Sequence, residues 1–425
     1  MGKTKIVISS DVGFNGFKTV VGEKSGDDII ELFKTHNNSD IARYKGESII
    51  NVVEDALYAE YTTATERRKY VIGNAAKDRY ADQVAADDIV SNFYTNSEDA
   101  YTDYKRFTTQ GMAITHLSVL NEALEKLAGI SEKYSDILIE PDKYELTIVV
   151  ELPEAIAKEN NYQSIIRDYI TNPASSSQYK VSIEGFDKVK AVPEILQKAN
   201  VVFTSQVYAA AVCEISSLDY DENQVSSEML PMFVFDGGGK TVGIATITKT
   251  FDLAEKRESN RNYSITKVCM NTSDVIYKEY NYRIEPQLIE SKATSKDMYM
   301  IADANEAGDY VEINVKDIYE KELKKTIEGL YKYVLDNYRS ELFSARSYLF
   351  AGGAGELYFN DLSKLIKSNF KNATIEKKYI LAKGKYGREE NGSIFSVAIG
   401  GLVLANSVVE FTFGKDYDCL LYTSD

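Results

Sequence analysis

The sequence is poor in several residue types, and each scarcity removes a class of function. It contains no tryptophan, two histidines, three cysteines and six prolines in 425 residues. The three cysteines are scattered and form no CxxC pair: Cys213, Cys269 and Cys419. We therefore expect neither a zinc site nor a disulfide scaffold, and we expect the protein to reside in a reducing cytoplasm. His36 lies in a polar segment and His116 in an amphipathic one, and neither is expected to be catalytic.

Long apolar runs and basic clusters are also missing. The most apolar stretch, residues 394–409, is interrupted by polar residues and is too short to span a bilayer, so a buried helix is predicted there. The first residues lead straight into a strand pattern, so a signal peptide is not expected. The net charge of −16 argues against direct nucleic-acid binding, which needs cations to displace counterions from phosphates. Neither a membrane nor nucleic acid is therefore expected as a direct partner, and action on DNA would need a basic adaptor protein.

The chain is long enough for two large domains, and its composition is that of an ordinary globular protein with 44% hydrophobic residues. Apolar runs and helical periodicity alternate, which predicts an α/β architecture. Strands are expected at residues 4–10, 16–22, 28–34, 70–72, 145–151, 178–184, 201–203, 232–236, 241–248 and 348–351. Helices are expected at residues 114–127, 154–170, 205–216, 272–280, 314–339, 357–370 and 394–409.

A predicted hairpin with glycines in its turn, near the start of the chain, is the first candidate site. An apolar run ends at Asp11 and is followed by a turn and a second strand that carries Lys18. Glycines in such a turn let the backbone approach a ligand closely, and successive N–H groups form an anion-binding concavity. The residues expected to bind phosphate here are Gly13, Phe14, Asn15, Gly16 and Lys18.

A second hairpin of the same design follows in mid-chain. The apolar run 232–235 leads to Asp236, three glycines and an outgoing strand. A carboxylate at the end of a buried strand suits Mg²⁺ held largely through water, so Asp11 and Asp236 are the predicted metal residues. Two ordinary hairpins with acidic turns would give the same pattern, although the duplication favours a polyphosphate clamp. Its predicted ligand-binding residues are Gly237, Gly238, Gly239, Lys240 and Thr241.

A third glycine cluster follows the apolar run 348–351. The residues Gly352, Gly353 and Ala354 come directly before a helical pattern, so the order is strand, glycine turn and helix. Small residues in this turn let a flat base or ribose lie against the backbone, and the helix N-terminus favours negative charge. This cluster is the predicted adenosine-binding segment.

Taken together, the three clusters resemble the motifs of the actin, sugar kinase and heat-shock ATPase superfamily, in that family's order. Its two phosphate loops look like Asp11-x-Gly13 with Lys18 and like Asp236-x-Gly238-Gly239-x-Thr241, and its adenosine motif looks like residues 352–354. The resemblance implies an actin-like two-domain α/β fold with a duplicated mixed-sheet core and a nucleotide cleft between the domains. It implies a first domain of residues 1–204, completed by a C-terminal helix at 398–425, and a second domain of residues 205–397.

The resemblance also implies cofactors and residue roles. ATP or GTP would bind with Mg²⁺, and Asp11 and Asp236 match the paired acids of the family. Gln206 matches the side chain that orients the attacking water, and since an amide is not a strong base, slow hydrolysis is expected. Lys278 and Phe395 are the predicted residues of the base and ribose pocket. The chain departs from the family pattern at Gly243, where many members carry an acid, and at 151–153, where bacterial members often show Gly-Leu-Pro.

Within the superfamily, the resemblance is to the bacterial branch of plasmid-segregation actins that includes ParM. A chaperone would need a peptide-binding domain after residue 401, and a membrane-tethered division protein would need a basic amphipathic helix at its end. A small-molecule kinase for sugars or acids stays open as the alternative. The expected partners are further copies of the chain, in head-to-tail filaments, and a DNA-binding adaptor.

Overall fold

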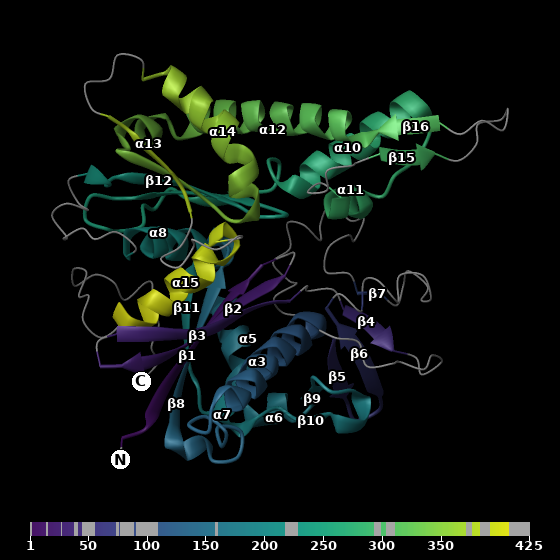
Figure 1. The fold of residues 1–425 in the computed structure, drawn as a ribbon, viewed down its shortest axis with the longest axis vertical. Helices are drawn as coiled ribbons and strands as arrows, with labels where there is room; N and C mark the ends of the chain where they lie inside the picture. Colours follow the sequence, from purple (N-terminus) through teal and green to yellow (C-terminus); the bar gives the residue numbers. More distant parts are fainter. Residues whose placement is uncertain are drawn as a thin grey trace. The chain divides into compact units, whose positions relative to one another are not determined.

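The computed structural model describes residues 2–13, 16–26, 28–37, 41–44, 56–73, 76, 89–90, 109–157, 160–216, 228–292, 299–302, 311–370, 376–382 and 392–407. The chain divides into two compact units (Figure 1). Unit 1 comprises residues 1–219 and 383–425, and unit 2 comprises residues 220–382.

Unit 1 is built on a five-stranded mixed sheet. Its strand order is β11 (Asn200–Ser205), β8 (Tyr144–Leu152), β1 (Thr4–Val12), β2 (Phe17–Ser25) and β3 (Asp28–Asn37). The pairs β11–β8 and β8–β1 are parallel, whereas β1–β2 and β2–β3 are antiparallel. Helices of the described chain cover both faces, since α3 (Gln110–Ile130) contacts β1 and β2, and α15 (Gly392–Ser407) contacts β1, β2 and β8.

The alternation of side chains along β1 separates two apolar layers. Ile6 and Ile8 join the core cluster that includes α3, whereas Val7 packs with residues of α15. Successive strand residues point to opposite faces, so Ser9 and Asp11 share the face of Val7. The helix α8 (Gln206–Ser216), which follows β11 directly, packs against α15. The end of β1 therefore brings Asp11 to the sheet face that α15 covers.

A second sheet in unit 1 has the strand order β10 (Lys190–Ala191), β9 (Tyr179–Ser182), β5 (Leu57–Thr62), β6 (Arg67–Ile72), β4 (Ile41–Tyr44) and β7 (Ile89–Val90). Further helices complete the unit. The short helix η3 (Pro141–Lys143) directly precedes β8, and five helices lie between β8 and β11: α4 (Glu154–Ala157), α5 (Asn160–Thr171), α6 (Pro173–Ser176), η4 (Phe186–Lys188) and α7 (Glu194–Gln197). The helix α3 contacts both β5 and β9, so it packs on this sheet as well as on the first.

Unit 2 repeats the sheet pattern of unit 1. Its strand order is β14 (Glu258–Asn260), β13 (Val242–Ile247), β12 (Met232–Gly237), β17 (Ser347–Ala351) and β18 (Lys378–Leu381). Here too an antiparallel hairpin, β12–β13, lies beside parallel strands, β12–β17 and β17–β18. When the unit 2 sheet is followed from β18 to β14, its strands have the same arrangement of parallel and antiparallel pairs as the unit 1 sheet from β11 to β3. This correspondence is the predicted duplication of the core.

Helices and a small hairpin complete unit 2. They are α10 (Ile265–Tyr280), α11 (Pro286–Lys292), α12 (Val315–Asn337), α13 (Arg339–Ser344), α14 (Gly353–Ser368) and the hairpin β15 (Tyr299–Ala302)–β16 (Val311–Asn314). The helix α14 contacts β12 and β17, and α12 packs against both α10 and α14. Figure 1 shows α13 near one end of α12, with α10, α11 and the β15–β16 hairpin toward the other end.

The predicted strands and helices correspond to observed elements, several of which differ in extent. Residues 154–170 contain two helices, α4 and α5, and the long pattern 314–339 ends at Asn337, before the separate α13. The helix predicted from 272 begins at Ile265, because the side chain of Ser264 caps it by accepting from the amide of Lys267. The predicted border at 204/205 assigned α8 to the second domain, whereas its packing against α15 groups it with unit 1.

The apolar stretch near the C-terminus forms a helix whose middle is buried, as predicted. Residues 396–402 of α15 are all buried. Among the described residues, the helices are all too short or too polar to cross a lipid bilayer.

The core of unit 1 contains a histidine that should make its stability depend on pH. His116 in α3 is fully buried, its Nδ1 lies 2.7 Å from the Tyr169 hydroxyl, and burial lowers its pKa to about 3. Below pH 6.5 the unfolded chain binds a proton here that the folded chain does not, so stability falls as the pH falls from 6.5 toward 3. We expect His116 to make the protein about 2 kcal/mol less stable at pH 5 than at pH 7.5.

Chemical denaturation at these two pH values would measure the effect. In the His116→Gln variant the difference in unfolding free energy between pH 7.5 and pH 5 should be smaller by that amount. An unchanged difference would contradict the assignment of this pH dependence to His116.

Candidate functional site

The end of β1 gathers a carboxylate, a cation and an amide in unit 1. Asp11 is 4% exposed, and its Oδ2 lies 3.2 Å from the Nζ of Lys18, its register partner on β2. Its Oδ1 accepts a hydrogen bond of 2.7 Å from the Nε2 of Gln206. Since β11 runs directly into α8, Gln206 stands at the first residue of that helix, beside the end of the sheet. Three of the predicted site residues thus lie together, although they are up to 195 positions apart in the chain.

The turn after Asp11 leaves no room for side chains at its glycines. A Cβ atom at Gly13 would lie 2.7 Å from the carbonyl oxygen of Gly16 and 2.8 Å from the Nζ of Lys18. One at Gly16 would lie 2.6 Å from the carbonyl oxygen of Asn37. Only glycine therefore fits at positions 13 and 16 of this turn, where neighbouring backbone and side-chain atoms leave no space for a Cβ atom. The two predicted residues Phe14 and Asn15 lie outside the described part of the chain.

A buried glutamate beside Asp11 was not among the predicted site residues. Glu151 on β8 is the register partner of Asp11, is fully buried, and accepts a hydrogen bond from the Ser9 hydroxyl. Burial, followed by the nearby charge of Asp11, raises the pKa of Glu151 well above its ordinary value, which favours a neutral carboxyl. A Cβ at Gly401 of α15 would collide with this carboxyl, so the helix backbone closes over it. The signal in the sequence was an acid at the end of an apolar strand.

The second hairpin is closed by backbone hydrogen bonds in unit 2. The amide of Gly238 donates to the carbonyl of Thr241 over 2.8 Å, and the amide of Thr266, in the first turn of α10, donates to the carbonyl of Gly239 over 2.8 Å. Asp236 is 9% exposed at the end of β12, and Lys240 is buried. The predicted loop is thus a fixed turn that is attached to the start of a helix.

The third cluster lies against the second hairpin. Gly352 has φ +73°, and a Cβ there would lie 2.5 Å from the carbonyl oxygen of Gly237 and 2.7 Å from Oδ1 of Asp236. A Cβ at Gly237 would in turn lie 2.8 Å from the Cβ of Ala354. The helix α14 begins at Gly353 without a capping side chain, which leaves N-terminal amides to other acceptors. The predicted second and third motifs therefore form one continuous surface in unit 2.

The two residues predicted for the base and ribose pocket lie at different places in the described chain. Lys278 is exposed near the end of α10, twelve residues and about 18 Å along the helix from Thr266. Phe395 belongs to unit 1, where its ring lies 6.4 Å from the ring of His36 and 5.4 Å from the Nζ of Lys34. His36 in turn lies against the first glycine turn, since its Nε2 would be 2.8 Å from a Cβ atom at Gly16. Phe395 is therefore one side chain away from the first turn, and the roles of both residues stay predictions.

The two predicted metal residues, Asp11 and Asp236, suit a Mg²⁺ ion that keeps most of its coordinated water. In the described ranges no three His, Cys, Asp or Glu side chains are grouped to hold a metal directly. Asp11 stands beside a tight glycine turn in unit 1, and Asp236 stands beside one in unit 2. Because Mg²⁺ in phosphate sites is typically bound through few carboxylates, waters and phosphate oxygens, these residues fit Mg-nucleotide.

Comparison with known proteins places this geometry in a structural class. No protein-family model matches the sequence, and no curated protein matches it by sequence. By structure, the chain is similar to the subunit of a 15-stranded ParM filament from Clostridium botulinum, with 17% identity, a TM-score of 0.63, and coverage of 96% of this chain and 100% of that one. It is similar to an archaeal actin homolog at 14% identity and a TM-score of 0.60, covering 94% and 99%.

A third similar structure is Bacillus thuringiensis ParM with ADP. Its identity to this chain is 13%, its TM-score is 0.53, and 95% of this chain and 99% of that one are covered. Structural similarity at 13–17% sequence identity establishes the fold and nothing further. The chain therefore has the actin-like two-domain fold, in the form seen in ParM proteins, and the predicted fold class is confirmed.

Proposed function

We propose that this protein is an actin-like nucleotidase that forms filaments with bound ATP or GTP and Mg²⁺ and hydrolyses the nucleotide slowly. One observation carries the proposal: Asp11 is held by the Gln206 amide at 2.7 Å and by the Lys18 ammonium at 3.2 Å, beside a turn in which positions 13 and 16 accept only glycine. The likeness of the fold to ParM structures, one of them a filament and one with ADP, supports it.

Each residue has a role that follows from its chemistry. The turns at Gly13–Gly16 and Gly237–Gly239 would bind phosphate oxygens through backbone amides, and Lys18 would add a positive charge. Asp11 and Asp236 would accept hydrogen bonds from the water shell of Mg²⁺, whose charge offsets that of the phosphates. Gln206 would orient the attacking water. Because these side chains would position the nucleotide and the water without reacting themselves, the rate of hydrolysis should be low.

The biological setting that we propose is the segregation of plasmid DNA in the cytoplasm. A chain with a net charge of −16 is poorly suited to hold DNA itself, so a basic adaptor protein would join the filament to DNA. A kinase acting on a small sugar or acid is the alternative with the same fold. The two functions differ in two testable properties: only the first requires assembly, and only the kinase transfers a phosphate to a sugar or acid.

Nucleotide should control assembly. We expect light scattering of the purified protein to rise with Mg-ATP or Mg-GTP and to stay at baseline without nucleotide, because bound nucleotide would favour head-to-tail contacts that continue without closing. Electron microscopy of the same samples should show filaments. Identical scattering traces with and without nucleotide, together with phosphorylation of a sugar or acid, would favour the kinase instead.

A further inference from the structure

A row of polar side chains crosses the central sheet of unit 1 at the level of Asp11. The register pairs Asp11 with Glu151 on one side and with Lys18 on the other. Lys18 is in turn paired with His36 on β3, and Glu151 is paired with Thr204 on β11. Cross-strand partners share a face of the sheet, so all five lie on the side that α15 covers. His36, at the β3 end of the row, was not among the predicted site residues.

The ring of His36 rests on the first glycine turn. A Cβ atom at Gly16 would lie 2.8 Å from its Nε2 and 3.2 Å from its Cδ2, so the edge of the imidazole lies directly over this turn. The ring also meets the ring of Phe395 edge-on, with 6.4 Å between the ring centres and an angle of 81° between their planes. The side chain is exposed, and among the described residues no hydrogen bond occupies its ring nitrogens. These nitrogens are therefore available to a ligand.

The end of β3 is fixed from the opposite face of the sheet. Asn37 follows His36, so its side chain points to the other face, where its Nδ2 donates a hydrogen bond to Glu122 of α3. Lys126 pairs with the same carboxylate at 2.7 Å. The carbonyl oxygen of Asn37 lies 2.6 Å from the position that a Cβ atom at Gly16 would take. The backbone that carries the imidazole is therefore already in place, and such preorganisation favours binding.

The charged groups of the row are separated by sign. The acids, Glu151 and Asp11, lie on β8 and β1, whereas the basic side chains, Lys18 and His36, lie on β2 and β3. Lys34, two residues before His36 on the same strand, adds a further cation on this face. A metal ion with its coordinated water would suit the acidic half of the row, and phosphate oxygens would suit the basic half.

The imidazole can respond to a bound anion. Burial of part of the ring lowers the pKa of His36, the charge of Lys18 lowers it further, and the charge of Asp11 partly opposes them. Lys34 on its own strand is the other charged group on this side, and Phe395 of α15 is uncharged. The ring is therefore neutral at pH 7 without a ligand, whereas a phosphate beside it would favour the protonated form.

We propose that His36 binds the phosphate chain of the nucleotide, with its Nε2 donating a hydrogen bond to a phosphate oxygen beside the first glycine turn. This inference rests on the proposed nucleotide-binding function and adds to it a residue that β3 contributes. A residue at the phosphates should affect the affinity for the nucleotide and leave the affinity for the nucleoside unchanged. A residue that only supports the turn would not make this distinction.

Competition against a fluorescent nucleotide, with Mg²⁺ present, would measure both affinities. His36→Ala should weaken the binding of ATP or GTP by about tenfold, as the loss of a hydrogen bond to a charged group typically does. The affinity for adenosine or guanosine should stay at the wild-type value. His36→Gln, which keeps an N–H donor on a side chain of similar reach, should recover most of the affinity for the nucleotide.

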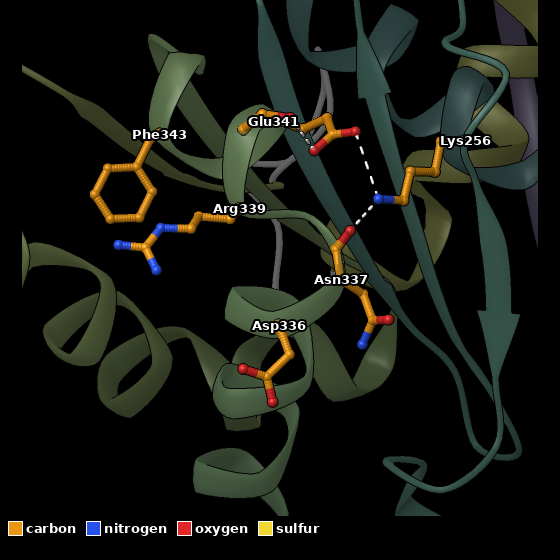
Figure 2. Close-up of a pocket in the computed structure, with 7 residues that line it drawn as sticks. Lys256, Asp336, Asn337, Arg339, Glu341 and Phe343 are labelled. Atoms are coloured by element: carbon orange, nitrogen blue, oxygen red, sulfur yellow. Dashed lines mark hydrogen bonds and ion pairs between the residues drawn. The ribbon is translucent and has the colours of Figure 1, made fainter.

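Lys256 in unit 2 provides the matched control. It lines a groove of about 600 Å³ beside α13, and Figure 2 shows that it points to Glu341 and to the backbone of Asn337. Its Nζ lies 3.8 Å from the Glu341 carboxylate and 4.6 Å from the centre of the Tyr338 ring. Like His36, it is a basic group beside an aromatic ring, but no glycine is among the described residues that line its groove. Lys256→Ala should therefore bind nucleotide like the wild type.

NMR of the histidine rings gives an independent readout, because the chain contains only two histidines. The signal that is missing from His36→Gln identifies His36, and His116 has a pKa of about 3 because it is buried. Saturating the wild type with Mg-ADP or Mg-GDP should move the titration midpoint of the His36 signal upward, since the phosphates favour the protonated ring. This measurement uses the wild type, so it does not depend on how well a variant folds.

The outcomes separate the role of His36 from the proposed function. If His36→Ala binds nucleotide as tightly as the wild type, or loses affinity for nucleotide and nucleoside alike, the inference is wrong and the nucleotidase proposal stands. A His36 titration that nucleotide leaves unmoved would also overturn the inference. If the wild type binds neither ATP nor GTP, the proposed function fails, and the inference fails with it.

Discussion

Replacing Gln206 with alanine is expected to lower the rate of nucleotide hydrolysis by about 100-fold, while nucleotide affinity changes only a few-fold. The Gln206 amide is fixed by its 2.7 Å hydrogen bond to Asp11 and by its place at the start of α8, so it is held in one orientation. A group that only orients water contributes through geometry, and losing such positioning typically costs on this order. Affinity would be retained because the glycine turns and Lys18 are untouched.

Single-turnover hydrolysis and equilibrium binding of a fluorescent nucleotide would separate the two quantities. Gln163→Ala is the matched control, because Gln163 is also a glutamine of unit 1 whose Nε2 donates one hydrogen bond, in this case to the Ala157 carbonyl over 3.0 Å. This variant should hydrolyse nucleotide like the wild type. If Gln206→Ala hydrolysed nucleotide at the wild-type rate, its role as the water-orienting residue would be refuted.

The central sheets could be predicted because buried strands leave a strong pattern. The runs 4–10, 145–151 and 232–236 are apolar on both faces, as strands covered on both sides must be, and each lies within an observed strand. The second sheet of unit 1 was largely missed. Its strands β4 and β5 lie in a stretch that reads as mixed polar sequence, because short strands of alternating character resemble loops when their partners are unknown.

The candidate site could be predicted motif by motif, but its register could not. Only pairing of the strands shows that Glu151 stands beside Asp11, since the two are 140 positions apart in the chain. The corresponding place in unit 2, beside Asp236, is taken by Ala351. A residue's neighbours across a parallel sheet depend on register, which local spacing does not encode. In the sequence, Glu151 was therefore visible only as an acid at the end of an apolar strand and as a departure from the family pattern.

Register also shows that the two copies of the hairpin are not equivalent. Lys18 is the cross-strand partner of Asp11, whereas Gly243 is the partner of Asp236. The sequence motifs predicted only that Lys18 and Thr241 lie in the outgoing strands of the two hairpins. The first acid thus has a cation and an amide beside it, and the second has a glycine opposite it and Gly352 against it. The two acids therefore have different cross-strand neighbours.

The α15–α8 contact gives the prediction with the largest expected effect on stability. A Cβ at Gly400 would overlap the backbone of Ala209 in α8, so Gly400→Ala forces the two buried helices apart. We expect a loss of about 3 kcal/mol in unfolding free energy and a fall in Tm of roughly 5–10 °C, as overpacking of a rigid backbone contact outweighs the higher helix propensity of alanine.

Gly129→Ala is the matched control for this substitution, because Gly129 is also helical, in α3, yet no atom would lie within 4 Å of its added Cβ. That variant should be unchanged or more stable by up to about 1 kcal/mol. Because α8 also carries Gln206, the shift forced by Gly400→Ala should lower hydrolysis in the fraction that remains folded, whereas Gly129→Ala should not. Thermal unfolding of both variants beside the wild type measures the first effect. Equal Tm values for the two variants would show that α15 and α8 are not in backbone contact at Gly400.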